Sequence, residues 1–423
     1  MTLASRPGPY PVYLFISGAF AVFFMLYATI ASVYRIQTVG LNPLELVLVG
    51  TVLELTTLIF EVPTGVVADT YGRKPSVVVG FLLIGAGFVL EGSIPVFAAV
   101  LAAQIVWGVG YTFISGALQA WIADEAPERI LGQVYLRGEQ ADYLGSLVGA
   151  LASGFLAIYA RNLPLLLAGA LTIALGVTLT VVMPERNFRP APAAGRRSWR
   201  RMEHTARGGF RVLRGRPVLL TLLAVTAFAG MSSEGFDRLW EAHFLKNFGL
   251  PELAGLDPVV WFGVINAGTL VLGFVAAEII GRVLDVGSAA VAARALFVLD
   301  ALTIAGVLAF ALAGSLAFAL GAFWFAGLVQ ALVQPIYLTW LNQGLEPGVR
   351  ATVISISSQA NAFGQIAGGP AIGAVGTFGG LRAALTVAGL VLSPALLLYA
   401  RAIRHGGTEP TLEEDGEQAE SEV

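Results

Sequence analysis

Acidic and basic side chains interrupt several long apolar stretches of this sequence. Glu54 and Glu61 lie seven residues apart in one stretch, so in a helix they share a face. Four charged residues in a second stretch follow at i, i+3, i+4 and i+7 and form a stripe: Glu234, Asp237, Arg238 and Glu241. A carboxyl group in apolar surroundings can bind and release a proton, so these acids are candidates for proton transfer.

Two of these acids are the better candidates because they lack a nearby cationic partner. Arg238 can neutralise Glu234 one helical turn earlier, which leaves Asp237 less compensated. Glu54 has no arginine or lysine within a helical turn along its own stretch, so we expect proton coupling at Glu54 and Asp237. The alternative is that each acid is paired structurally, or that the stripe lies at a hydrated helix end. Two further acids in apolar stretches rank below them: Asp142 and Asp300.

Other kinds of chemistry have little support in the sequence. There is no cysteine, and the three histidines (204, 243 and 405) are far apart without an HExxH pattern, so we expect no disulfide, metal site or cofactor. The glycine run at 364–373 lacks the Gly-Lys-Ser/Thr of a phosphate loop and is better interpreted as helix packing. Nothing resembles a nucleotide-binding domain, and no nucleic-acid partner is expected.

The elements that position these charges are long apolar helices. Hydrophobic residues make up 56% of the chain and charged residues 13%, with a mean hydropathy of +0.76. A hydrocarbon layer of about 30 Å takes about 20 helical residues to cross, and stretches of that length recur along the chain. The sequence therefore predicts an all-α integral membrane protein with twelve spans. The predicted spans are 10–39, 44–68, 75–92, 95–124, 135–160, 163–183, 217–247, 258–283, 288–313, 315–345, 353–376 and 381–402.

Charge along the loops predicts the orientation in the bilayer. Ten arginines and only two acids lie between Glu185 and Arg216, and arginine-rich loops stay on the cytoplasmic side. We expect an N-terminal bundle (1–184), a cytoplasmic linker (185–216), a C-terminal bundle (217–404) and an acidic, disordered cytoplasmic tail (405–423). Both termini would be cytoplasmic. The preference for arginine over lysine, with abundant alanine and glycine, points to a GC-rich bacterium and its inner membrane.

A weak internal repeat relates the two halves. Gly65 and Asp69 close the second predicted span, and Gly281 and Asp285 close the eighth, with the same displacement of 216 positions. Two bundles of six helices related by pseudo-symmetry are typical of secondary transporters.

The loop between the second and third spans carries the most specific motif. The stretch GVVADTYGRK at 65–74 resembles the loop signature of the major facilitator superfamily, G-x-x-x-D-[RK]-x-G-[RK]-[RK], with Thr70 at a position that is usually basic. The resemblance implies two six-helix bundles that transport solutes by alternating access. It also implies a gating latch formed by six residues: Gly65, Asp69, Gly72, Arg73, Lys74 and Asp124.

The residue types in this motif suit a latch. Gly65 and Gly72 permit close helix approach and a tight turn. Asp69 can accept hydrogen bonds from the N-terminus of a facing helix, and Arg73 can pair with a carboxylate such as Asp124. The alternative is ordinary positive-inside topology, in which Arg73 and Lys74 are only solvated.

Two other stretches are similar to the drug-efflux branch of this family, which includes macrolide and tetracycline exporters. These are SGALQAWIADE (115–125) and SSEGFDRLWEAHFL (232–245). Two departures put the place of proton coupling in doubt. Gln104 stands where drug antiporters carry an arginine, and the fifth span lacks the proline of the antiporter pattern.

By this resemblance, spans one, four, seven and ten would line a central cavity. Neutral amides and aromatic rings on these spans suit a bulky amphipathic ligand, although polar packing between helices would explain them equally. The expected cavity residues are Tyr27, Gln104, Trp107, Tyr111, Glu234, Arg238, Gln330, Gln334 and Tyr337.

The sequence thus favours a monomeric, proton-coupled exporter of amphipathic small molecules in the lipid bilayer, and not an enzyme. A nutrient importer of the same fold is the first alternative. An intramembrane enzyme would need a nucleophile with a base, and His243 has no evident serine partner. A transport-inactive sensor is the third alternative.

Overall fold

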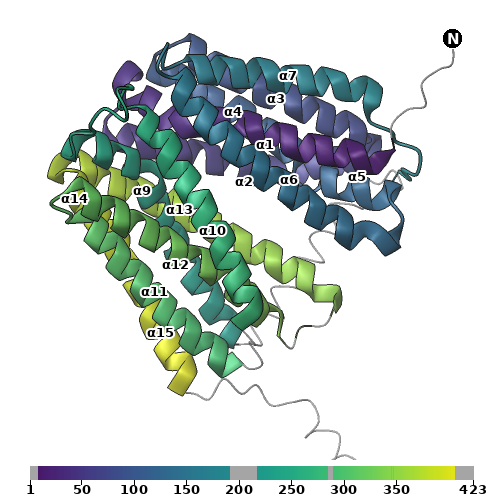
Figure 1. Cartoon of the computed structure of the whole chain (residues 1–423). Coiled ribbons are helices and arrows are strands. Elements are labelled where there is room, and N and C mark those ends of the chain that lie inside the picture. The colour runs from purple at the N-terminus through teal and green to yellow at the C-terminus, as the bar shows by residue number, and fades with distance from the viewer. Residues whose placement is uncertain (1–7, 191–216, 284–288, 344, 346, 405–423) are drawn as a thin grey trace, which may run out of the picture.

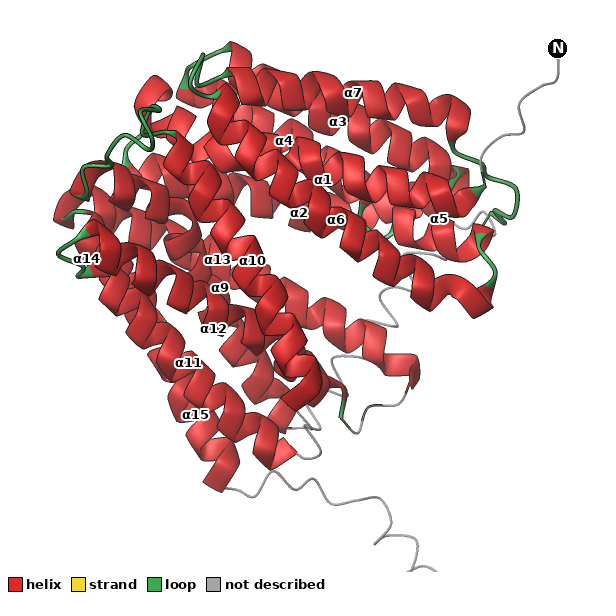
Figure 2. Cartoon of the chain, viewed as in Figure 1, coloured by secondary structure: helices red, strands yellow, loops and turns green. Residues whose placement is uncertain are grey.

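Two helical bundles make up the protein, as seen in a computed structural model that describes residues 8–190, 217–283, 289–343, 345 and 347–404 (Figure 1). Helices account for most of the described residues, and no strand is present among them (Figure 2). The all-helical membrane fold predicted from hydropathy is confirmed.

Each of the first six predicted spans corresponds to a helix or to two consecutive helices. These are α1 (Pro9–Tyr34) with the π-helical turn Arg35–Val39, α2 (Pro43–Tyr71), α3 (Arg73–Ser93), α4 (Phe97–Ile114) with α5 (Ala117–Glu125), α6 (Leu131–Leu156) and α7 (Leu163–Val182).

The last six predicted spans are matched in the same way. They are α9 (Pro217–Asn247), α10 (Val260–Val283), α11 (Ala289–Ala311), α12 (Leu316–Asn342), α13 (Pro347–Gly379), and α14 (Leu381–Val391) with α15 (Ser393–Arg404).

Three of these helices are less apolar than the rest. Nine helical stretches in the described residues are long and apolar enough to cross a membrane, and Val260–Ala276 of α10 is a shorter apolar helix. The spans outside the nine are α6, α10 and α13. These helices lie at the contact between the two bundles, which we call the seam. There α6 packs on α10 and α13 packs on α2, so part of their surface faces protein in place of lipid. That position permits the charged, small and amide residues that lower their hydropathy.

Local sequence signals set the ends of the helices. Asn42 and Glu45 form a capping box at the start of α2, where Pro43 occupies the first turn. Gly72 separates α2 from α3 at φ 127°, a backbone conformation that favours glycine. Within the N-terminal bundle, a Cβ added at Gly85 would lie 2.6 Å from the carbonyl oxygen of Gly169, so glycines set the α3–α7 distance.

The two bundles converge at one end of the molecule and diverge at the other (Figure 1). We call the end where α1 begins and α15 finishes the terminal end, and the opposite end the far end. A Cβ added at Gly376 of α13 would lie 2.8 Å from Pro43 of α2, and one at Gly154 of α6 would lie 3.3 Å from Gly263 of α10. The Leu44 backbone N–H also donates to Thr377 Oγ1 at 3.1 Å. The bundles are therefore closed against each other at the far end.

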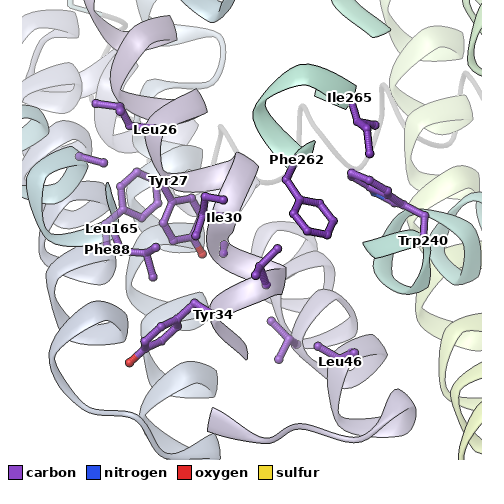
Figure 3. Close-up of a cluster of buried hydrophobic side chains, with 14 of the residues drawn as sticks. Leu26, Tyr27, Ile30, Tyr34, Leu46, Phe88, Leu165, Trp240, Phe262 and Ile265 are labelled. Carbon is purple, nitrogen blue, oxygen red and sulfur yellow. The ribbon is translucent and has the colours of Figure 1, made fainter. Parts of the chain in front are cut away.

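The hydrophobic core continues across this closed seam. Tyr27 of α1 stacks on Phe88 of α3, with ring centroids 3.8 Å apart, and Trp240 of α9 lies 5.9 Å from Phe262 of α10. Both aromatic pairs belong to one cluster of buried side chains, which also includes Leu46 of α2 (Figure 3).

Candidate functional site

A buried ion pair lies inside the N-terminal bundle, near the C-terminal ends of α1 and α3. Arg35 Nε donates to Glu91 Oε1 at 2.7 Å, and Arg35 Nη2 donates to Glu91 Oε2 at 3.1 Å. The Glu91 side chain is fully buried and that of Arg35 nearly so. Charges buried this deeply require partners, and the two-point contact provides them.

Three of the predicted cavity residues form a hydrogen-bond network with the Arg35–Glu91 pair. The Tyr27 hydroxyl donates to Glu91 Oε2 at 2.8 Å, and Gln104 Nε2 donates to the same oxygen at 2.8 Å. Trp107 Nε1 in turn donates to Gln104 Oε1 at 2.8 Å. Tyr27 and Gln104 are therefore buried within the N-terminal bundle in this conformation, while Trp107 is half-buried.

Sequence reasoning missed Arg35 and Glu91. Both lie within predicted spans, but near the ends, where a charge is expected to reach water. A signal was present in the sequence: the first and third predicted spans end at the same face of the bilayer, and they carry charges of opposite sign near those ends.

A second ion pair, on α9, lies against the N-terminal bundle. Arg238 Nε donates to Glu234 Oε1 at 3.1 Å, and Glu234 is buried. A Cβ added at Gly50 of α2 would lie 1.8 Å from Glu234 Oε1 and 2.2 Å from Arg238 Nε. Only glycine at this position lets the charged pair approach α2 so closely.

The two acids predicted to couple protons lie beside this pair. Glu54 of α2 is half-buried, and the charges of Glu234 and Arg238 act on it across the seam. Asp237 of α9 is exposed, and the charges of Arg238 and Glu234 act on it as well. We call Glu54, Glu234, Asp237 and Arg238 the seam cluster. It contains three carboxylates and one guanidinium.

Glu241 links the seam cluster to the buried pair. It is buried one turn beyond Arg238, close to Ser32 of α1 and within electrostatic range of Arg35 and Arg238. Its Oε2 atom makes no hydrogen bond among the described residues. Charged groups from both bundles thus form one continuous set across the seam.

The other expected cavity residues divide between the two bundles. Tyr111 of α4 is exposed, and its ring lies 6.5 Å from that of Trp107. Gln334 and Tyr337 of α12 line a recess of about 370 Å³ inside the C-terminal bundle. Gln330 is exposed and is not among the residues that line this recess.

Among the described residues, the latch residues meet partners from the N-terminal bundle and from Glu185, the first residue of the linker. Arg73 pairs with Asp69 and lies 3.6 Å from Asp124. The Lys74 backbone N–H donates to Glu185 Oε1 at 2.9 Å, and the same carboxylate lies against Gly72. A Cβ added at Gly65 would meet nothing within 4 Å, which fits bundles that diverge at this end. The repeat residue Asp285 and linker residues 191–216 lie outside the described residues.

An ion pair between the bundles lies at the far end. Arg161, after α6, donates through Nη2 to both oxygens of Asp257, before α10, at 3.0 and 3.1 Å. Partial burial acts to raise the pKa of Asp257, but the Val259 N–H at 2.8 Å and the Arg161 guanidinium outweigh it and hold that pKa below its ordinary value. Sequence reasoning missed this pair because both residues lie in loops.

Replacing Asp257 with asparagine should let the far end open more readily, because the contact to Val259 can persist while the charge pairing is lost. The pair is partly exposed, so its contribution is about 1 kcal/mol or less, a change of about fivefold or less. In this cysteine-free chain, a cysteine introduced at the buried seam residue Val47 should react faster with a maleimide in the D257N background.

The pH dependence provides the check on that experiment. Because the pKa of Asp257 is lowered in the folded protein, its pairing with Arg161 stabilises the closed far end at any pH above the ordinary carboxyl pKa. This stabilisation is lost only when the pH falls through the lower pKa of the folded state. The ratio of labelling rates should therefore be constant between about pH 6 and pH 8. Equal rates in both backgrounds would show that the pair does not hold the far end closed.

Comparison with known proteins places the chain in a family. A sequence model of the Major Facilitator Superfamily matches residues 12–369. A protein of Bacillus subtilis (strain 168), named uncharacterized MFS-type transporter YxaM, is 24% identical over 364 residues, which cover 84% of this chain and 86% of that protein.

Solved structures share the fold. The crystal structure of the nucleoside transporter NupG has a TM-score of 0.75 at 12% identity, covering 96% of this chain and 100% of that chain. A bacterial homologue of the human lysosomal transporter Spinster, in an inward-facing and unoccupied conformation, has a TM-score of 0.73 at 16% identity, covering 95% and 98%. The family match over most of the length and the shared fold agree: the chain belongs to the Major Facilitator Superfamily and is a membrane transporter of that type.

Proposed function

We propose that this transporter is a proton-coupled exporter of amphipathic small molecules that works by alternating access. The observation that carries the proposal is the seam cluster. Three carboxylates face one guanidinium at the contact between the bundles, so the cluster holds an excess of acid. An excess of carboxylates within a membrane protein favours the binding of a proton or of a cationic solute.

The position of the seam cluster supports coupling to movement of the bundles. Glu54 belongs to α2, whereas Glu234, Asp237 and Arg238 belong to α9. Rocking of one bundle against the other changes the separation of these charges. It therefore changes the free energy of proton binding by the carboxyl groups of the seam cluster. The latch at the terminal end and the Arg161–Asp257 pair at the far end would then close in alternation.

Apolar space along the seam supports an amphipathic substrate. Pockets of about 410 and 430 Å³ lie along α6 and α10. Leu144 and Phe274 line the first, and Leu151 and Trp324 line the second. Exposed aromatic and leucine side chains at such a place can receive the apolar body of a solute directly from the bilayer.

The direct test is transport by purified protein in proteoliposomes. A panel of fluorescent dyes and antibiotics would be offered under an imposed pH gradient, in both directions and after collapse of the gradient with a protonophore. Accumulation against a concentration gradient that requires the opposing proton gradient supports proton-coupled export. Accumulation that is independent of the pH gradient for every compound would contradict it.

The alternative is that the protein imports a polar nutrient, and the polar lining of the recess in the C-terminal bundle favours it. The nucleoside transporter NupG shares the fold, and the recess in the C-terminal bundle is lined by hydroxyl and amide groups. The two directions are separated by the same assay, because an importer accumulates its solute along the direction of proton flow. A transport-inactive sensor would bind a solute and accumulate none.

We also propose that the terminal end faces the bacterial cytoplasm, since the arginine-rich segment follows α7 at that end. Two exposed loop glutamates at opposite ends permit a matched test: Glu128 at the terminal end and Glu252 at the far end. In intact cells, an impermeant maleimide should label E252C and spare E128C until the membrane is permeabilised. The reverse pattern would invert the topology.

A further inference from the structure

The recess in the C-terminal bundle has features that the seam cluster does not explain. It has a volume of about 370 Å³ and lies among α9, α11, α12, α13 and α15. Two of its polar lining residues, Asp300 of α11 and Tyr399 of α15, have buried side chains. The lining of the recess thus includes a buried carboxyl group.

The polar wall of the recess is only partly satisfied by the protein. The Tyr337 hydroxyl and Ser357 Oγ lie 2.6 Å apart and share one hydrogen bond. Tyr399 lies beside Asp300, and its hydroxyl can donate one hydrogen bond to that carboxyl group. A carboxylate has two oxygens that can each accept hydrogen bonds, so a single hydroxyl leaves room for a donor from a ligand.

The charge of Asp300 is also uncompensated. No lysine, arginine or histidine is among the described residues that line the recess. The carboxyl group of Asp300 is affected by its burial and by the neighbouring Tyr399 hydroxyl, and no cationic side chain acts on it. An ionised carboxylate that is buried without a cation is costly, so the group either takes up a proton or binds a positively charged ligand.

We propose that this recess binds a protonated organic amine, with Asp300 accepting from the ammonium group and Tyr399 next to it. The volume of the recess exceeds what a bare ion fills, and its wall is mixed. Apolar side chains such as Val225, Val333 and Ile354 share the lining with the hydroxyls of Tyr337 and Ser357. A cation with an apolar or aromatic body matches this combination.

This inference deepens the proposed function, because it names the class of substrate that the C-terminal bundle would recognise, and it rests on that proposal for its link to transport. Binding itself is measured without a gradient. A failure to bind amines would therefore overturn this inference alone, whereas a failure of gradient-driven transport would overturn the proposed function.

The test is calorimetric titration of the detergent-purified full chain with 2-phenylethylamine and with its neutral counterpart, 2-phenylethanol. We expect the amine to bind measurably and the alcohol to bind about tenfold or more weakly, as when a charge-assisted hydrogen bond is lost. The D300N variant should bind the amine about tenfold or more weakly and should no longer distinguish the two compounds. Equal binding of amine and alcohol by the unmodified protein would overturn the proposal.

Two further variants keep the test decisive. Asp142→Asn removes an exposed carboxylate from α6 of the other bundle and should leave amine binding unchanged. Tyr399→Phe keeps the carboxylate and removes the hydroxyl, so it should weaken amine binding by a smaller factor than D300N even if D300N folds poorly. An equal loss of amine binding in D142N, or unchanged binding in both recess variants, would assign the amine to another site.

Discussion

Replacement of Glu91 with alanine is expected to destabilise the protein strongly. The change leaves the Arg35 guanidinium buried without its carboxylate and removes the acceptor of both Tyr27 and Gln104. Breaking one side of a buried ion pair costs about 3–5 kcal/mol. We expect a clearly lower midpoint of thermal unfolding in detergent and a large loss of monodisperse protein on size exclusion.

Two variants test whether the charge itself is responsible. Glu139→Ala removes an exposed glutamate of α6 and should change the free energy of unfolding by about 0.5 kcal/mol or less. The double variant R35M/E91Q removes both charges and retains an acceptor for Tyr27, so it should recover most of the stability. If E91A unfolds at the same temperature as E139A, the pair does not stabilise the bundle.

The helices were predictable because membrane spans leave a strong signal. A run of about twenty apolar residues is both necessary and nearly sufficient for a spanning helix, so all twelve predicted spans have a counterpart. The internal breaks were not predicted. Hydropathy is blind to the glycine at 116, where φ is 73° and α4 gives way to α5, and to the π-helical turn that begins at Arg35.

The site was predicted in part. Periodicity along one helix identified the Glu234–Arg238 pair, and the family motif placed Asp124 near Arg73. Contacts between different helices carry no such periodicity. The approach of Arg35 to Glu91 and of Arg161 to Asp257 depends on the packing of whole helices, and a single sequence does not specify that packing. Gly50 illustrates the limit, because its small size matters only once Glu234 lies against it.

Neutralising the proton carrier should abolish accumulation driven by the pH gradient while sparing substrate binding and downhill flux. We expect this result for Glu54→Gln or Asp237→Asn, with Glu54 ahead. Glu54 approaches the Glu234–Arg238 pair from the opposite bundle, so movement of the bundles changes its surroundings most directly. Asp237 lies on the same helix as that pair and moves with it.

The measurement is uphill and downhill transport by each variant in the same proteoliposomes, across a series of imposed pH gradients. Glu139→Gln, at an exposed position of α6, is the matched control and should transport as the unmodified protein does. Loss of uphill transport with retained exchange identifies a carrier, because exchange needs the substrate site and the conformational cycle but no net proton movement. If both E54Q and D237N still drive uphill transport with an unchanged pH profile, the seam cluster does not carry the proton, and Asp142 and Asp300 are the next acids to replace.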